Sequence, residues 1–108
     1  MKRGAIVVVA VKGGYTGKPR PALVVQSDLF NPTHRSVTIC PITSDCVDAP
    51  LFRIPLPPGK RTGLRVPSQI MIDKIVSVPR ESIRSEIGGC DDRELETAED
   101  ALRRWLSL

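Results

Sequence analysis

The sequence predicts a mainly β fold that ends in one α-helix. Short apolar runs rich in β-branched residues recur through the first 90 residues, which is typical of strands. Gly, Pro and Asn-Pro turn signals separate these runs. After residue 90 the apolar residues recur at spacings of three and four, as in an amphipathic helix. With 108 residues, the chain has the length of one small domain, residues 1–108.

The expected strands follow from the apolar runs. Residues 5–11 are continuous and β-branched, which predicts a strand buried on both faces. Residues 22–26 and 36–40 are the next two strands, and Pro41 is expected to end the third because it has no backbone N–H. The remaining expected strands are an edge strand at 51–56 and two pieces at 63–65 and 69–75. Residues 76–83 are ambiguous, since Pro79 interrupts them.

One helix is predicted from Asp91 or Asp92, either of which can cap its start, to about Ser107. Acidic residues near its start and arginines near its end suit the helix dipole. Its expected apolar stripe consists of Leu95, Ala98, Leu102, Trp105 and Leu106. The glycine-containing segment 12–19, far upstream, is expected to be a flexible loop long enough to move over a site.

The charge distribution favours an anionic partner. The net charge is +4, and half of the acidic residues lie after residue 90, so that the body of the chain is distinctly basic. A basic body is the expected footprint of a nucleic-acid binder, although many basic domains bind no nucleic acid.

The cysteines and the chain start favour a reduced, cytoplasmic protein. The chain has three cysteines, Cys40, Cys46 and Cys90, and this odd number argues against a disulfide framework. No Cys-x-x-Cys pair occurs and His34 is the only histidine, so no zinc site is expected either. No apolar run approaches the length of a membrane span, and the first four residues lead directly into a strand. We therefore expect neither a signal peptide nor a membrane anchor.

Arg20 is the first candidate site residue, because prolines flank it on both sides. Pro21 favours an extended backbone at Arg20, and the strand that follows fixes its position. A guanidinium held in this way can bind a phosphate with two hydrogen bonds and stabilise the extra charge of a pentavalent transition state. The alternative is a surface arginine that merely flanks a strand.

Thr43, at the end of the next strand, is the second candidate. Its hydroxyl can bind a phosphate oxygen or help to pass a proton, and Ser44 is a weaker version of the same group. Ser/Thr pairs after strands often only cap turns, so that reading stays open.

The remaining candidates are weaker. Asp73 is an acid in an expected strand, which disfavours Asp, so it is either a site residue or an edge residue. Lys18 and Lys74 could contact phosphates, and Ser68 and Gln69 could read a base edge. No phosphate-binding Gly-rich loop, nucleophile elbow or metal-binding histidine motif occurs in the sequence.

Four blocks together carry a resemblance to a known family. They are Gly17-Lys18-Pro19-Arg20-Pro21-Ala22-Leu23-Val24-Val25-Gln26-Ser27-Asp28, Pro41-Ile42-Thr43-Ser44, Gly63-Leu64-Arg65-x-Pro67-Ser68-Gln69 and Asp73-Lys74, with Gly4-x-Ile6-Val7 ahead of them. In this order and spacing the chain resembles the MazF/PemK toxin endoribonucleases from Gly4 through the predicted helix.

The resemblance implies a small SH3-like antiparallel barrel of the MazF/CcdB type with a C-terminal helix, assembled as a homodimer. It implies metal-independent cleavage of single-stranded RNA without a cofactor, in which the ribose 2′-hydroxyl attacks the adjacent phosphate to give a 2′,3′-cyclic phosphate and a 5′-hydroxyl. The family's key arginine falls on Arg20 and its key threonine on Thr43. Arg20 would stabilise the phosphorane and donate a proton to the leaving oxygen, and Asp73 would be a base or an RNA contact.

The implied RNA-binding residues are Lys18, Ser44, Ser68, Gln69 and Lys74. The implied partners are mRNA and a flexible, acidic antitoxin of a type II toxin–antitoxin system. One departure is Ala5, where many members have Asp after the glycine. The rival interpretations are a CcdB-like toxin that binds gyrase and a non-catalytic RNA-binding barrel, because fold alone does not fix function.

Overall fold

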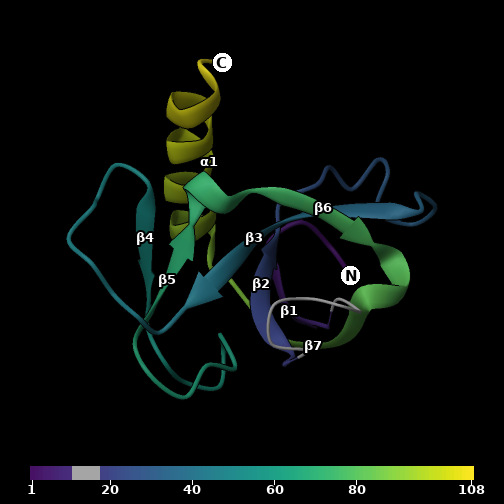
Figure 1. Ribbon diagram of the computed structural model, residues 1–108, viewed down its shortest axis with the longest axis horizontal. Coiled ribbons are helices and arrows are strands. Elements are labelled where there is room, and N and C mark those ends of the chain that lie inside the picture. Colours follow the sequence, from purple (N-terminus) through teal and green to yellow (C-terminus); the bar gives the residue numbers. More distant parts are fainter. Residues whose placement is uncertain (11–17) are drawn as a thin grey trace.

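The computed structural model describes residues 1–10 and 18–108 (Figure 1). Most of the loop predicted at 12–19 therefore lies outside the described residues. The strands are β1 (Ala5–Val9), β2 (Arg20–Val24), β3 (Ser36–Thr43), β4 (Arg53–Leu56), β5 (Ser68–Met71), β6 (Val76–Pro79) and β7 (Ile83–Gly89). Two 3₁₀ turns, η1 (Ile72–Lys74) and η2 (Arg80–Ser82), flank β6, and helix α1 (Asp92–Leu106) follows β7.

The strands form one antiparallel sheet in the order β4-β5-β3-β2-β1-β7, with β6 paired to β3. β3 is the hub: its first half pairs with β6, its second half pairs with β5, and β2 runs along its other edge. Among the described residues no ladder joins β4 to β7, so the barrel-like sheet stays open. The prediction of a mainly β, antiparallel, barrel-like fold with a C-terminal helix is confirmed.

The core has two parts, one on each face of the sheet. Successive residues of β1 enter different parts: Ile6 packs in one cluster with Leu23 and Ile70, and Val7 packs in the other with Val24. Both β1 residues are fully buried, which confirms the prediction that this strand is covered on both faces. Helix α1 closes the first cluster beside β4 and β5, where Ala98 and Ala101 are buried (Figure 1).

The helix begins and ends where the sequence predicts. Asp91 is its N-cap, and Glu94 completes a capping box in which each side chain accepts the other residue's backbone N–H. The apolar stripe is only partly buried, however, since Trp105 and Leu106 are about half exposed.

The prediction that Pro41 ends the third strand is wrong, because β3 continues to Thr43. Pro41 falls at a change of partner: β6 pairs with β3 up to Ile39, and β5 pairs with it from Ile42 onward. Neither of these two ladders includes Pro41, so its missing N–H interrupts no pairing on that edge of β3. On the other edge Pro41 lies opposite Ala22 of β2.

Two other strand predictions also need correction. Residues 63–65 form no strand: Gly63 has a φ of +74° and turns the chain against β7. The predicted strand 69–75 ends at Met71, and Asp73 lies in the 3₁₀ turn η1. The ambiguous segment 76–83 divides at Pro79 into β6 and η2.

Candidate functional site

A surface cavity of about 270 Å³ opens where β2 begins and β3 ends. Arg20 at the start of β2 and Thr43 at the end of β3 both line it, so the structure brings the two leading candidates together. Ser44 and Ser68 line the same cavity. The rest of the lining is Val8, Pro19, Pro21, Ile42, Gly63, Leu64, Arg65, Val66 and Ile87.

Arg20 is held by its backbone and not by its side chain. It is the first residue of β2, opposite Val9 in the β1–β2 ladder, with prolines on both sides. The side chain is exposed, and it makes no hydrogen bond or ion pair with any of residues 1–10 and 18–108. Its N–H donors are therefore available to an anion in the cavity.

Thr43 has a defined hydroxyl orientation. Its Oγ1 accepts the backbone N–H of Asp45 at 3.0 Å, in a turn that directly follows β3. Because this contact uses the oxygen as an acceptor, the hydroxyl proton stays available for donation. The turn-capping role and the phosphate-binding role considered for this threonine are therefore compatible.

Gln69 holds the segment that follows Thr43. Its Oε1 accepts the backbone N–H of Val47 at 3.1 Å, and its Nε2 donates to the Val47 carbonyl at 2.8 Å. Gln69 also lies opposite Thr43 in the β3–β5 ladder. Both ends of the amide are thus used within the fold, and this side chain does not line the cavity.

Asp73 lies apart from the cavity lining. Its Oδ1 is 3.9 Å from Nε of Arg53, and neither of these two buried atoms has a hydrogen-bond partner among the described residues. Arg53 in turn reaches toward the Asp45 carbonyl and Oε1 of Gln69, at 3.4 and 3.5 Å. Asp73 therefore supports the arginine that lies behind the segment following Thr43.

The two predicted lysines are also outside the lining. Lys18 is exposed two residues before Arg20, and Lys74 is exposed in η1. Ser68, in contrast, is buried at the cavity, and its hydroxyl donates to the Val66 carbonyl at 2.9 Å. It therefore orders the segment that enters β5.

Arg65 is a lining residue that sequence reasoning did not select as a site residue. It comes from the segment between β4 and β5, which was predicted to be a strand piece. With Arg20 it gives the cavity two guanidinium groups, and no Asp or Glu is among the described residues that line it. The cavity is therefore suited to an anion. The basic composition was the signal available in the sequence, but it did not single out this arginine.

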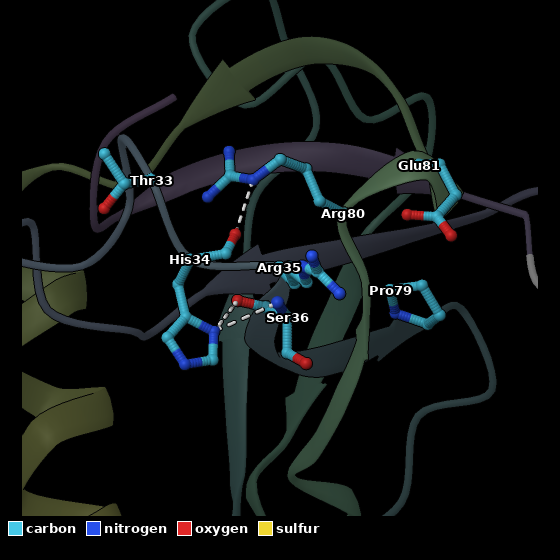
Figure 2. A pocket seen from close by; sticks show the side chains of 7 residues that line it. All are labelled: Thr33, His34, Arg35, Ser36, Pro79, Arg80 and Glu81. Carbon is cyan, nitrogen blue, oxygen red and sulfur yellow. Dashed lines mark hydrogen bonds between the residues drawn. The ribbon is translucent and has the colours of Figure 1, made fainter.

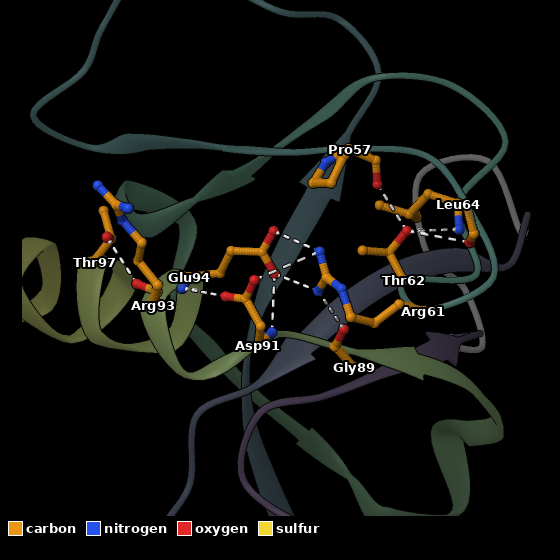
Figure 3. Close-up of polar contacts among 10 residues, drawn as sticks. Pro57, Arg61, Thr62, Leu64, Gly89, Asp91, Arg93, Glu94 and Thr97 are labelled. Atoms are coloured by element: carbon orange, nitrogen blue, oxygen red, sulfur yellow. Dashed lines mark hydrogen bonds and ion pairs between the residues drawn. The ribbon is translucent and has the colours of Figure 1, made fainter.

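The segment 57–66 between β4 and β5, which carries Arg65, forms one wall of the cavity. Contacts of Arg61 fix this wall against β7 and α1 (Figure 3). Arg61 binds Glu94 through two nitrogens, at 2.5 and 3.0 Å, and donates to the Gly89 carbonyl at 3.2 Å. The Gly89 N–H in turn donates to the Arg61 carbonyl at 2.8 Å. Glu94 raises the pKa of Arg61 through this hydrogen bond.

Glycines allow this wall to approach β7 closely. A Cβ on Gly63 would lie 2.1 Å from the carbonyl oxygen of Ile87, and one on Gly88 would lie 2.3 Å from the backbone of Thr62. Thr62 itself is buried, and its hydroxyl donates to the Pro57 carbonyl at 2.7 Å.

A second surface cavity, of about 570 Å³, lies at the other end of β3 (Figure 2). It contains none of the predicted site residues. Arg80, one of the lining residues, donates through Nε to the His34 carbonyl at 2.7 Å and through Nη2 to the Asn31 carbonyl. These contacts give Arg80 a role in joining η2 to the turn before β3.

The three cysteines are unpaired, as expected from their number. Burial raises the pKa of the Cys40 thiol to about 12, and the Asp73 carboxylate adds to this shift. Burial also raises the pKa of Cys90 to about 12. These two thiols are therefore protonated at neutral pH and poor nucleophiles. Separately, no helix in the described part of the chain is long and apolar enough to cross a membrane.

Comparison with known proteins relates this chain to a family. A curated relative from Mycolicibacterium smegmatis, named "Probable endoribonuclease MazF", is 43% identical over 108 residues and is covered to 98%, with all of this chain aligned. Another, "Endoribonuclease MazF9" from Mycobacterium tuberculosis, is 30% identical over 116 residues, with 100% of this chain and 98% of the relative covered.

A solved structure has the same fold. It is described as an endoribonuclease in complex with its cognate antitoxin from a mycobacterial species, and it superimposes with a TM-score of 0.83 at 18% identity. The match covers 100% of this chain and 96% of that chain. Residues 2–106 also match the family described as "PemK-like, MazF-like toxin of type II toxin-antitoxin system". The chain therefore belongs to the PemK-like, MazF-like family of type II toxin–antitoxin toxins.

Proposed function

We propose that this protein is a toxin endoribonuclease that cleaves single-stranded RNA at the Arg20–Thr43 cavity. The observation that carries the proposal is that one cavity is lined by a guanidinium and an oriented hydroxyl. Among the described residues, that guanidinium has no hydrogen-bond or ion-pair partner and no acid lines the cavity. An RNA phosphate is an anion that both groups can bind. The names of the curated relatives support the same activity.

The proposed reaction is an internal transesterification. The ribose 2′-oxygen attacks the adjacent phosphorus, its proton passes to solvent water at the open cavity, and the bond from phosphorus to the 5′-oxygen breaks. The leaving 5′-oxygen takes up a proton, so the products are a 2′,3′-cyclic phosphate and a 5′-hydroxyl. No metal ion or cofactor takes part in these steps as proposed.

The two leading residues have separate roles in this reaction. Arg20 binds the non-bridging oxygens, stabilises the charge of the phosphorane and supplies a proton to the leaving oxygen. Thr43 donates its free hydroxyl proton to a phosphate oxygen, while the Asp45 N–H holds its oxygen in place. Ser44, exposed at the same cavity, contacts the neighbouring sugar-phosphate.

The proposed partners follow from the same charges. The substrate is mRNA in the cytoplasm, and an acidic antitoxin segment inhibits the toxin by covering the basic cavity. A structural relative described as a complex with its cognate antitoxin supports an antitoxin as a partner. A homodimer is proposed as the active assembly, and light scattering of the purified protein measures it directly.

The test of the proposed function is cleavage of a long single-stranded RNA by the purified protein in EDTA. We expect fragments with 2′,3′-cyclic phosphate and 5′-hydroxyl ends, and no cleavage of DNA of the same sequence, which has no 2′-hydroxyl. Uncut RNA across varied sequences would contradict the enzyme proposal. Fragments with 5′-phosphate ends would contradict the mechanism alone.

Asp73→Asn separates a catalytic role from a supporting one. The catalytic role inferred from the family resemblance stays a prediction, and the contact with Arg53 favours support. We expect the variant to cleave RNA within about threefold of the parent rate but to lose ~1–2 kcal/mol of unfolding free energy, because Arg53 loses its carboxylate in a mostly buried setting. Cleavage rates and urea unfolding measure the two effects. Lost cleavage with unchanged stability would favour the catalytic role instead.

A further inference from the structure

Arg65 is the unassigned cation of the cavity described above. We propose that it binds a backbone phosphate of the RNA, so that it contributes to substrate affinity and not to the chemical step. This inference rests on the proposed function, because it names a further substrate contact for the same site. Three features of the structure support it: the charge of the cavity, the support of the wall, and the burial of the neighbouring residue.

The charge of the cavity is the first feature. Arg65 is exposed, lines the cavity with Arg20, and makes no hydrogen bond or ion pair with residues of the described ranges. Two like charges at one cavity repel each other unless an anion binds between them, so the lining favours an anionic ligand. Other arginines show the alternative: Arg3 and Arg103 each contact a carboxylate, at 2.6 and 2.8 Å.

The support of the wall is the second feature (Figure 3). The two-nitrogen contact of Arg61 with Glu94 ties the segment before Arg65 to the first turn of α1. Within the segment, the Gly63 N–H donates to the Gly59 carbonyl at 2.8 Å, and the Gly59 N–H donates to the Leu64 carbonyl at 3.0 Å. The backbone that presents Arg65 is therefore ordered before any ligand arrives.

The burial of Leu64 is the third feature. Leu64 directly precedes Arg65 and is only 8% exposed, packed in the core cluster that also contains Leu56 and Ala98. A buried residue on one side fixes where the next side chain leaves the backbone. Such preorganisation lowers the entropy cost of binding, because less backbone freedom remains to be lost.

Phosphate is the ligand chemistry that this arrangement fits. A guanidinium presents parallel N–H groups that match two phosphate oxygens. Arg20 and Thr43 together already provide a donor pair for the reacting phosphate. Arg65 comes from a separate segment and extends the positive lining beyond that pair, which suits a second phosphate of the same strand.

The test compares Arg65→Ala with Arg84→Ala in the full chain. Arg84 is the matched control, since it is an exposed arginine on β7 that does not line the cavity. We expect Arg65→Ala to raise KM for a short single-stranded RNA by about tenfold, with kcat within about twofold of the parent. Arg84→Ala should leave both constants near the parent values.

Salt dependence gives a readout that a merely structural role would not change. Binding is measured with a 2′-O-methyl RNA, which has no attacking hydroxyl and stays uncut. For each lost phosphate contact, the slope of the logarithm of the association constant against the logarithm of the salt concentration should fall in magnitude by about 0.7. Arg65→Lys should restore the slope, because it keeps the charge, but should restore KM only in part.

The inference is overturned if Arg65→Ala matches Arg84→Ala in KM and in salt slope. It is also overturned if Arg65→Ala lowers kcat and leaves KM unchanged, since that pattern places the arginine at the reacting phosphate. Failure of the proposed function is distinguishable, because the parent protein then leaves RNA uncut. The binding and salt measurements on the uncleavable RNA test Arg65 in that case as well.

Discussion

Replacing Arg20 by Ala is expected to lower kcat for RNA cleavage by about 10³-fold while leaving the protein folded. Loss of a positioned donor to a developing phosphorane charge typically has an effect of this order. The fold should tolerate the change because the side chain is exposed and makes no hydrogen bond or ion pair with residues in the described ranges. Single-turnover cleavage rates and a thermal melt measure the two quantities.

Two further variants sharpen the Arg20 result. Arg20→Lys keeps the charge at the start of β2 but loses the paired N–H groups, so we expect an intermediate rate. Arg84→Ala removes the same charge from open surface on β7 and should cleave at the parent rate. If Arg20→Ala cleaved RNA as fast as the parent, Arg20 would have no catalytic role, even if the protein remained an endoribonuclease.

Replacing Gly63 by Ala is expected to lower the free energy of unfolding by at least about 3 kcal/mol. The new Cβ would lie 2.1 Å from the Ile87 carbonyl oxygen, which is backbone and cannot swing aside. The φ of +74° adds strain for any residue with a Cβ. Urea unfolding followed by circular dichroism measures the loss.

The neighbouring glycines of β7 provide the controls for this steric argument. A Cβ on Gly88 would lie 2.3 Å from the backbone of Thr62, so Gly88→Ala should also destabilise the protein strongly. Gly89→Ala should cost little, because its Cβ would lie 3.5 Å from the Gly4 carbonyl oxygen, an ordinary contact. Equal losses at Gly88 and Gly89 would show that the close approach of the two segments does not set stability.

Local sequence was sufficient to predict the features that local chemistry sets. The capping box at Asp91 and the β-branched run of β1 are such features, since neighbouring residues along the chain determine both. Arg20 and Thr43 were also predictable as a pair. Each lies at the end of a strand, and consecutive antiparallel strands bring such ends together.

The features that the sequence did not predict depend on contacts between distant segments. Pro41 remains in β3 because it lies where the pairing of β3 changes from β6 to β5. Arg65 lines the cavity on a segment that Gly63 brings against β7, a strand far along the chain. Asp73 was expected in a strand near the chemistry, and its 3₁₀ turn instead points it to Arg53.

Glu94 has two roles at once: it completes the capping box of α1 and holds Arg61 on the wall of the cavity. Because α1 follows every strand in the sequence, a ribosome makes Arg20, Thr43 and Arg65 before it makes Glu94. An interrupted nascent chain therefore carries these cavity-lining side chains but lacks the carboxylate that fixes the wall of the cavity. For a toxin, this order of synthesis would delay assembly of the complete cavity until the ribosome has translated all of the strands and the start of α1.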